Sequence, residues 1–457
     1  MAGIGVELKN ILKKNTIFST VRAYGYAAVV TSGPYVISII TILLIGYILS
    51  SLFIPQKTKA FQVIVTYTIA FSLILTSPFQ LTFTRYVADR LFEKKHSKVF
   101  PTLNLVLILS MTVSFVFSLI LSYLFLKDVG LLFSMLFTAN LVAFSGVWIV
   151  NILLTSLKNY KFIVFSFFIS FALIFGSALF FVKYLGLEGL MLSLLIGIFL
   201  LFVLLYGYIA KSYPSKKLLE FDFLNKKNIF ISLIFIGVFY NCAIWIDKFI
   251  FWFHSDTGEQ VLSIFRTSIL YDIPIFFAYL AIIPGLAVFL LRIETDYIQY
   301  YQSYYKAVVK GEPLKKLFYY GEELGIQARN TLIDVLLIQL IADIIIIIFL
   351  ENILEIFEIP SQYAYLFYVD IVGTTLQLFV ITILAFLFYF DRRKDALVVS
   401  FVFFILNFSL SLITIYLGPL FYGYGFTLSL LVASVIGLLA MRNFLRGLHY
   451  ETYMLRS

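Results

Sequence analysis

The chain of 457 residues is 61% hydrophobic and only 13% charged, and its mean hydropathy is +0.99. Soluble domains are closer to half apolar and a quarter charged, so this composition excludes a soluble enzyme, a disordered scaffold and a secreted disulfide domain. The formal net charge is +9, and the one cysteine, Cys242, lies inside an apolar run. A disulfide framework or a thiolate metal cluster is therefore excluded. These features predict a polytopic membrane protein.

A membrane-spanning helix needs about 20 mostly apolar residues, and by that measure the chain is predicted to be all-α with twelve transmembrane helices. The first apolar stretch is too long for a cleaved signal peptide, so we expect it to remain as a membrane anchor. The predicted spans are 25–53, 61–84, 101–126, 130–156, 162–182, 189–210, 229–253, 267–291, 330–352, 363–390, 396–416 and 424–441.

The distribution of basic residues predicts the orientation, because cytoplasmic loops are enriched in Lys and Arg. With both termini cytoplasmic, 28 of the 34 Lys and Arg residues fall in inner segments and 6 elsewhere. We expect two six-helix bundles, at 1–210 and 229–457, joined by a cytoplasmic linker at 211–228. The second bundle is expected to include a cytoplasmic amphipathic segment at 292–329.

The seventh predicted span carries polar residues, which a bilayer tolerates only with a partner or a wet cavity. Asn241, Trp245, Lys248 and Trp252 share one stripe of that helix. Aromatic rings beside an amide and an ammonium suit the apolar face and hydroxyl rim of a sugar, so this stripe is a candidate substrate path. Trp252 can instead be an interfacial belt residue.

Charged residues on neighbouring spans fall at matching depths when the helical rise is about 1.5 Å per residue. Lys248 is predicted to pair with Asp272 of the eighth span, with Asp247 nearby; Tyr271 precedes Asp272, and we include it in this candidate outer gate. Asp343 and Asp370 match in the ninth and tenth spans. The latter two carboxylates can share a proton, a cation or a polar network, or they can simply tie helices together.

Helix breakers mark other candidate positions, because transporters interrupt spans where backbone lines a cavity. Gly33 and Pro34 in the first span, and Pro274 and Pro284 in the eighth, are predicted breaks or hinges.

An aromatic stripe follows the eighth span, with tyrosines at 297, 300, 301, 304 and 305. It fits an interfacial amphipathic helix, or a docking surface for a cytosolic partner or an emerging polymer. The predicted inner vestibule consists of Arg22, Arg85, Asp89, Glu294 and Asp296.

No catalytic constellation is visible in the sequence. There is no Walker A motif, and His96, His254 and His449 lie in different segments without metal-ligand spacing. We therefore expect a protein that is not an enzyme and that has no metal or cofactor.

Short motifs in order along nearly the whole chain resemble the PelG family, the inner-membrane transporters of Pel exopolysaccharide systems. Cys242 stands where a small residue such as Leu or Gly is expected. The motifs are the opening residues 1–5 with Glu7-Leu8, Arg22-Ala23-Tyr24-Gly25-Tyr26, Ser32-Gly33-Pro34, Tyr240-Asn241, Trp245-Ile246-Asp247-Lys248, Tyr271-Asp272-Ile273-Pro274, Ala278-Tyr279-Leu280, Ile283-Pro284, Glu294-Thr295-Asp296, Tyr389-Phe390-Asp391 and Tyr422-Gly423-Tyr424-Gly425.

The resemblance implies a member of the multidrug/oligosaccharidyl-lipid/polysaccharide exporter superfamily in the inner membrane. It also implies export of an N-acetylgalactosamine- and N-acetylglucosamine-rich polymer for biofilm formation, with a PelF-like cytosolic glycosyltransferase and PelD-like and PelE-like membrane partners. Three alternatives stay open: a flippase for lipid-linked oligosaccharide, a cation-coupled drug antiporter using Asp343 and Asp370, and a non-transporting anchor for a glycosyltransferase.

Overall fold

The computed structural model describes residues 8, 10–11, 13, 16–52, 55–156, 160–225, 229–356, 360 and 364–454. The opening motif at 1–5 and Glu7, residues 226–228 of the predicted linker, and the span ends at 53 and 363 lie outside the described residues.

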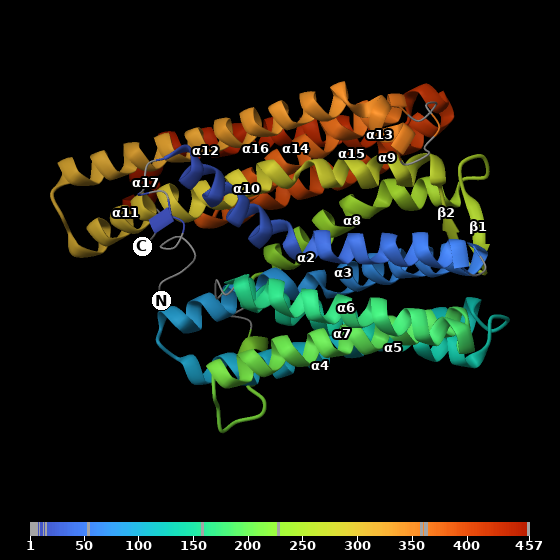
Figure 1. Cartoon of the computed structure of the whole chain (residues 1–457). Helices are drawn as coiled ribbons and strands as arrows, with labels where there is room; N and C mark the ends of the chain where they lie inside the picture. The colour runs from blue at the N-terminus through green and yellow to red at the C-terminus, as the bar shows by residue number, and fades with distance from the viewer. Residues whose placement is uncertain are drawn as a thin grey trace. The chain divides into compact units, whose positions relative to one another are not determined.

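Helices dominate the described chain (Figure 1). The helices and strands are α2 (Ile17–Leu52), α3 (Pro55–Phe92), η1 (His96–Lys98), α4 (Val99–Phe125), α5 (Leu131–Ser156), α6 (Tyr160–Leu185), α7 (Leu187–Ser212), η2 (Phe221–Leu224), α8 (Ile231–Phe253), β1 (Glu259–Leu262), β2 (Phe265–Thr267), α9 (Ile269–Ala281), α10 (Ile283–Arg292), η3 (Ile293–Tyr297), α11 (Ile298–Lys310), α12 (Leu314–Ile348), α13 (Leu350–Ile356), α14 (Ala364–Tyr389), α15 (Arg393–Leu417), η5 (Pro419–Phe421), α16 (Tyr424–Arg446) and α17 (Leu448–Met454).

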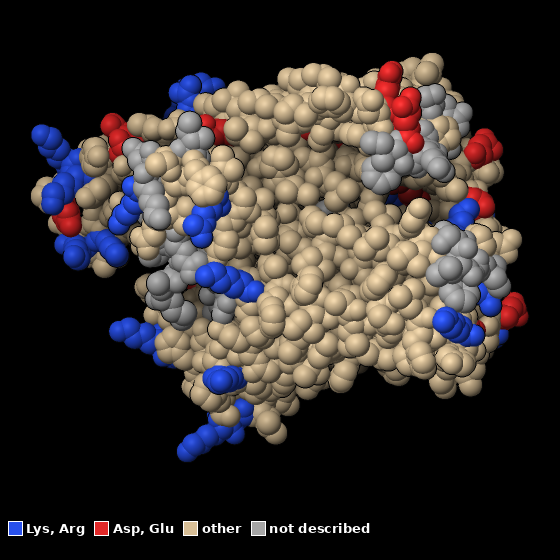
Figure 2. Space-filling view, viewed as in Figure 1, with Lys and Arg blue, Asp and Glu red and all other residues tan. Residues whose placement is uncertain are grey.

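The prediction of an all-α polytopic membrane protein is confirmed. Within the described residues, eleven helices are long and apolar enough to cross a membrane, and α2 makes a twelfth if its two bent parts count as one span. Each predicted span falls on one of these helices. Figure 2 shows charged side chains at the helix ends and an uncharged surface between them, as a lipid environment requires.

The chain forms two compact units whose boundaries differ from the predicted division. The N-terminal unit consists of Gly33–Trp245 and Phe251–Ile269, and the C-terminal unit consists of Met1–Ser32, Ile246–Ile250 and Leu270–Ser457. The six-plus-six bundles and the cytoplasmic termini remain predictions.

In the N-terminal unit, α3 to α7 pack as a bundle held by small and polar contacts. Ser114 of α4 hydrogen-bonds Ser145 of α5 at 2.7 Å, and Ser118 donates to Thr138 at 2.9 Å. A Cβ on Gly197 of α7 would overlap the side chain of Ile174, so α6 and α7 approach too closely for a larger residue. Such contacts are typical of membrane helices, where lipid tails are as apolar as the core and close packing replaces hydrophobic burial.

The sequence reasoning missed a short hairpin of strands β1 and β2, which packs beside α3. Arg266 fixes it by donating from Nε to the Trp252 carbonyl at 2.8 Å and from an η nitrogen to the Gly258 carbonyl at 2.8 Å. Lys59 of α3 forms a 2.6 Å salt bridge with Glu259 of β1. The fold is therefore helical with one small two-stranded addition.

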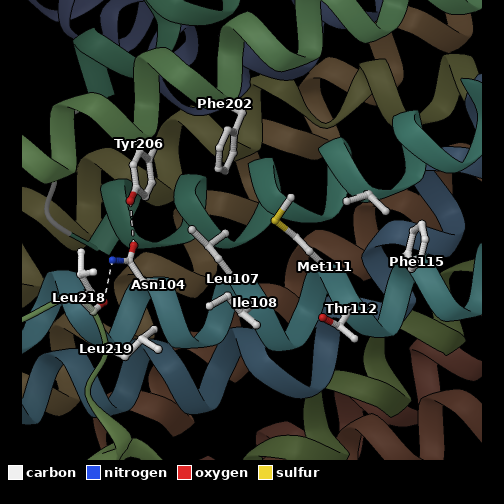
Figure 3. A pocket seen from close by; sticks show the side chains of 11 residues that line it. Asn104, Leu107, Ile108, Met111, Thr112, Phe115, Phe202, Tyr206, Leu218 and Leu219 are labelled. Atoms are coloured by element: carbon white, nitrogen blue, oxygen red, sulfur yellow. Dashed lines mark hydrogen bonds between the residues drawn. The ribbon is translucent and has the colours of Figure 1, made fainter.

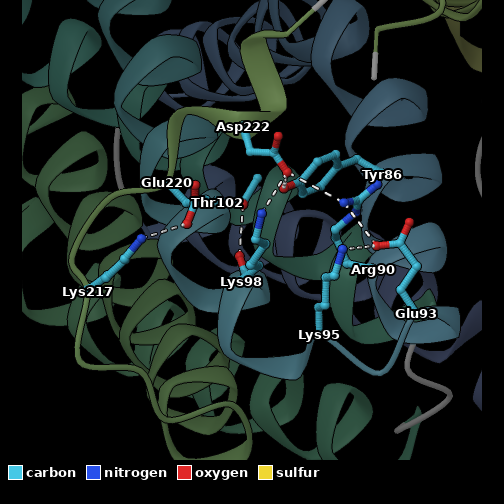
Figure 4. A network of polar contacts seen from close by, with 9 residues as sticks. All are labelled: Tyr86, Arg90, Glu93, Lys95, Lys98, Thr102, Lys217, Glu220 and Asp222. Atoms are coloured by element: carbon cyan, nitrogen blue, oxygen red, sulfur yellow. Dashed lines mark hydrogen bonds and ion pairs between the residues drawn. The ribbon is translucent and has the colours of Figure 1, made fainter. Parts of the chain in front are cut away.

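The carboxylate of Asp222 ties the segment after α7 to the N-terminal unit (Figure 4). It accepts hydrogen bonds from Lys98 at 2.9 Å and the Tyr86 hydroxyl at 3.2 Å, and it lies 3.5 Å from a guanidinium nitrogen of Arg90. The hydrogen bond and charge of Lys98 hold the pKa of Asp222 below its usual value. The predicted linker is therefore anchored at this point.

In the C-terminal unit, α12 begins 16 residues before the predicted span, so the amphipathic segment forms a helical hairpin. Helix α11 packs against the first turns of α12. Gly311 caps α11 with φ +64°, a left-handed conformation that favours glycine, and its N–H reaches the Val308 carbonyl at 3.2 Å.

Candidate functional site: a buried charge cluster

Helices α8 and α9 bring a carboxylate, an ammonium and a phenol together inside the C-terminal unit. Asp247 and Lys248 are 0% and 5% exposed. Lys248 Nζ lies 3.2 Å from Asp247 Oδ2, and the Tyr271 hydroxyl donates a 2.6 Å hydrogen bond to the same oxygen. Adjacent residues of a helix do not face each other, so this ion pair requires the long lysine stem to bend back.

Aromatic rings surround the same ammonium group. Lys248 Nζ lies 5.4 Å from the ring centre of Tyr279 on α9 and 5.3 Å from that of Phe426 on α16. Both distances fall within the range of cation–π attraction, about 6 Å. The sequence did not predict these two contacts, although Tyr279 lies in the Ala278-Tyr279-Leu280 motif.

Asp370 of α14 completes the cluster electrostatically, because it interacts with the charges of Lys248 and Asp247. Its side chain is fully buried, and neither carboxylate oxygen has a hydrogen-bond partner in the described part of the chain. Gly423, at the start of α16, has φ +83°, and a Cβ there would lie 3.0 Å from Asp370 Oδ1. Two buried carboxylates beside one ammonium leave a negative charge uncompensated unless a proton or a cation is bound.

The charge pairing differs in part from the sequence prediction. The carboxylate seen to hold Lys248 is that of Asp247. Asp272, on the first turn of α9, is half-buried and remains a predicted partner of Lys248.

Asp343 belongs to a separate network at the break between α9 and α10. Its carboxylate accepts hydrogen bonds from Gln339 at 2.7 Å and from Thr375 at 2.5 Å. Gln339 also donates to the Ala281 carbonyl at 2.9 Å and accepts from the Gly285 N–H at 3.1 Å. The network therefore satisfies backbone groups that the break exposes, and the structure does not join Asp343 to Asp370.

The predicted hinge residues lie at different kinds of position. Pro284 stands in the first turn of α10, directly after the break, whereas Pro274 is buried inside an unbroken α9. Helix α2 bends by 58° between Phe18–Pro34 and Val36–Leu49, beside Gly33 and Pro34. Motion at these positions remains a prediction.

The tryptophan stripe of α8 is only partly open. Trp252 is 2% exposed, and its ring centre lies 4.7 Å from that of Tyr67 and 6.4 Å from that of Trp245. The Asn241 amide donates to the Gly237 carbonyl of its own helix at 3.0 Å. Trp245 is half-buried, so it is the tryptophan of the two with ring surface left for a ligand.

The residues of the predicted inner vestibule lie in both units. On the C-terminal unit, Arg22 is exposed, and Arg292 forms salt bridges with Asp296 at 2.9 Å and with Asp334 at 2.8 Å. Glu294 lies with Asp296 on the π-helical turn η3, which the sequence reasoning did not predict.

On the N-terminal unit, Arg85 and Asp89 form an i,i+4 pair at 3.2 Å on α3. A common vestibule remains a prediction.

The tyrosine stripe is partly internal. Tyr297 and Tyr304 are both 0% exposed. The Tyr297 ring packs at 4.8 Å from Phe386, and the Tyr301 hydroxyl donates to the Tyr389 carbonyl at 3.1 Å. Part of the stripe therefore anchors η3 and α11 to α14 rather than facing outward.

An apolar groove of about 790 Å³ lies between α4, α5 and α7 in the N-terminal unit (Figure 3). Its polar residues at one end are already paired: the Tyr206 hydroxyl donates to the Asn104 amide oxygen, and the Asn104 amide donates to the Leu218 carbonyl, both at 2.9 Å. No charged side chain lines this groove in the described structure, so it lacks the groups that orient a sugar. Within the same residues, no group of three His, Cys, Asp or Glu side chains could hold a metal ion.

The fold is that of a membrane transporter. A multidrug-resistance MATE family transporter of the MOP superfamily, in an outward-facing conformation, matches with a TM-score of 0.64 and 14% identity. A MATE protein in the bent conformation matches with a TM-score of 0.65 and 13% identity, and a MOP superfamily transporter from Pyrococcus furiosus matches with 0.62 and 12%. Each match covers 93% of this chain and 96% of the other chain.

The family model of PelG, an exopolysaccharide exporter (EPS-E), matches residues 1–453. The chain therefore belongs to the PelG family and is a transporter rather than an enzyme. No curated protein matches the sequence. The predicted family is confirmed, and the fold is similar to that of MOP superfamily transporters.

Proposed function

We propose that this protein exports a Pel-type exopolysaccharide, rich in N-acetylgalactosamine and N-acetylglucosamine, across the cytoplasmic membrane for biofilm formation. A cytosolic PelF-like glycosyltransferase supplies the polymer, and PelD-like and PelE-like proteins are membrane partners. Membership of an exopolysaccharide exporter family supports the substrate class. Both termini face the cytoplasm, in keeping with the charge distribution of the loops.

The observation that carries the proposed mechanism is the buried cluster of Asp247, Lys248 and Asp370 within membrane-spanning helices. Such residues are expensive in a bilayer and mark transport pathways and relays. Sugar hydroxyls compete with Asp247 for the Lys248 ammonium, and the pair opens as an outer gate. Trp245 offers ring surface to the apolar face of a sugar, and Tyr271 holds the Asp247 carboxylate in place.

Asp370 supports a second element of the mechanism, coupling to a proton or a monovalent cation. A buried carboxylate without a hydrogen-bond donor binds such an ion more readily than one that is already satisfied. Ion binding at Asp370 changes the charge that Lys248 experiences and thus the strength of the gate. Asp343, whose partners are Gln339 and Thr375, serves the helix break instead.

Replacement of Lys248 tests the gate. Lys248→Ala should reduce secreted polymer to background while the protein remains abundant in the membrane, as measured by an amino-sugar-binding lectin and by immunoblot. Lys306→Ala, which removes an exposed lysine of α11, is the matched control and should export normally. Wild-type export by Lys248→Ala would contradict the gate. Loss of abundance in both Lys248→Ala and Lys248→Met would assign the pair a structural role.

Affinity purification from native membranes tests the cargo and the partners. Recovery of a cytosolic glycosyltransferase with an amino-sugar polymer supports the Pel-type exporter. Recovery of the chain with a polyprenyl-linked oligosaccharide would favour a flippase. Recovery of the chain alone, with drug transport that follows an ion gradient, would favour an antiporter.

A further inference from the structure

A second groove, of about 630 Å³, opens on the C-terminal unit between α12 and α16. Both helices pack against α14, which contributes Phe379 to the lining. Gly325 leaves this part of α12 without a side chain, and a Cβ there would still be 4.0 Å from Leu445 of α16. The groove volume lies within the range of about 300–1,000 Å³ that is typical of ligand sites.

Three arginines line this groove. Arg329 of α12 and Arg442 and Arg446 of α16 line it, all three are exposed, and none forms an ion pair within the described residues. Arg442 and Arg446 are one helical turn apart. Glu322 is the one carboxylate among the lining residues, so the rim carries an excess of two positive charges.

The rest of the lining is apolar and lies on helices that cross the membrane. Its side chains are those of Ile326, Leu332, Ile333, Leu336, Phe379, Leu438, Met441 and Leu445. From the arginines toward Leu336 and Leu438, the groove runs along the spans, so a hydrocarbon chain can lie in it while its head group stays at the arginines.

We propose that this groove binds one anionic phospholipid, with an acyl chain along the apolar lining and the phosphate between Arg329, Arg442 and Arg446. A guanidinium binds phosphate through paired hydrogen bonds, and basic pockets between membrane helices select anionic head groups. A zwitterionic lipid brings its own cation to the same rim and is disfavoured there. The site lies apart from the Asp247–Lys248 gate and does not depend on the proposed cargo.

Native mass spectrometry of the detergent-purified full chain tests the site. The chain is titrated with phosphatidylglycerol or with phosphatidylcholine of the same acyl chains, and we expect one phosphatidylglycerol to be retained preferentially. Each lost arginine should weaken that binding roughly five-fold, so Arg442→Gln with Arg446→Gln should weaken it roughly 25-fold. Leu438→Trp fills the groove and keeps all three arginines, and it should also weaken phosphatidylglycerol binding. Lys306→Gln with Lys310→Gln removes the same charge from α11 and should retain the lipid.

Three results would overturn the proposal. Equal retention of the two lipids would remove the anionic selectivity, and equal loss in the lysine control would assign the binding to overall charge. Unchanged lipid retention in both groove variants would exclude the groove itself, and a dimer that these variants convert to a monomer would then identify it as an interface between copies. Circular dichroism and gel filtration of each variant establish that it is folded.

Discussion

Asp343 and Asp370 show how two buried carboxylates on adjacent helices can differ in role. Asp343 accepts two side-chain hydrogen bonds, and one of the donors, Gln339, also binds backbone groups at the ends of α9 and α10. Asp370 has no donor within the described residues. An ion that binds a carboxylate must compete with the donors already present, so Asp370 is the better candidate for coupling.

Export should distinguish these two carboxylates. Asp370→Asn removes the ionisable group and should abolish any dependence of export on a proton or sodium gradient. Asp343→Asn keeps an oxygen that accepts the hydrogen bond from the Thr375 hydroxyl, so the dependence of export on the gradient should remain. The measurement is polymer export from vesicles with and without an imposed gradient. Gradient dependence that survives in Asp370→Asn and disappears in Asp343→Asn would reverse the assignment.

The Tyr271 hydroxyl is expected to stabilise the cluster because it donates to a buried carboxylate. Tyr271→Phe should cost about 1.5–3 kcal/mol, the range for hydrogen bonds to charged groups, and should lower the unfolding midpoint in detergent. Tyr297→Phe is the control, since that buried hydroxyl has no partner in the described structure, and its midpoint should change little. Equal midpoints for the two variants would contradict the role of the hydroxyl.

For single residues, the sequence predicts which side chains are unusual in a membrane span, but it does not predict which of them are in contact. Asp247, Lys248, Asp343 and Asp370 stand out because a bilayer penalises charge. Their partners depend on side-chain direction, which a depth calculation ignores. Lys248 bends toward its sequence neighbour, a pair that helical spacing disfavours.

At the scale of helices and strands, the long apolar windows predict every membrane span. The hairpin β1–β2 was missed because strands of four and three residues give almost no period-two signal. The early start of α12 was missed because its first turns are polar, so a hydropathy window does not register them. The anchor at Asp222 joins segments more than 120 residues apart, which no local pattern reveals.

The anchor of the segment after α7 should depend on pH. The pKa of Asp222 is lowered in the folded chain, so its contribution to stability is fully present above the unfolded value, about 3.9, and is lost as the pH falls through the lowered folded value. A nitroxide at Lys216→Cys, with Cys242→Ser, should be immobile near neutral pH and become mobile in acid.

Two variants complete the test of this anchor. Asp222→Asn should make the nitroxide mobile at neutral pH. Glu220→Gln, whose partner is the exposed Lys217 at 3.4 Å, should not. An immobile label in Asp222→Asn would show that other contacts hold the segment.

At the scale of the whole molecule, the predicted orientation is the property that the charge distribution supports most directly. In a Cys242→Ser background, a cysteine at Lys183 should react in intact cells with a membrane-impermeant maleimide. A cysteine at Lys310 should react only after the membrane is permeabilised. Both side chains are exposed, so accessibility to the protein surface does not differ. The opposite pattern would invert the topology.

The C-terminal unit is assembled from segments that are far apart in the sequence, and this has a consequence for biosynthesis. Its first segment ends at Ser32, but its main part begins at Leu270. At about 5–20 residues per second, a ribosome makes the intervening 237 residues in roughly 12–47 s. During that time the part of α2 up to Ser32 leaves the ribosome without its packing partners, whereas α3 to α7 can already assemble. The nascent chain therefore needs the lipid, the insertion machinery or a membrane chaperone to shelter this part of α2 until the last helices arrive.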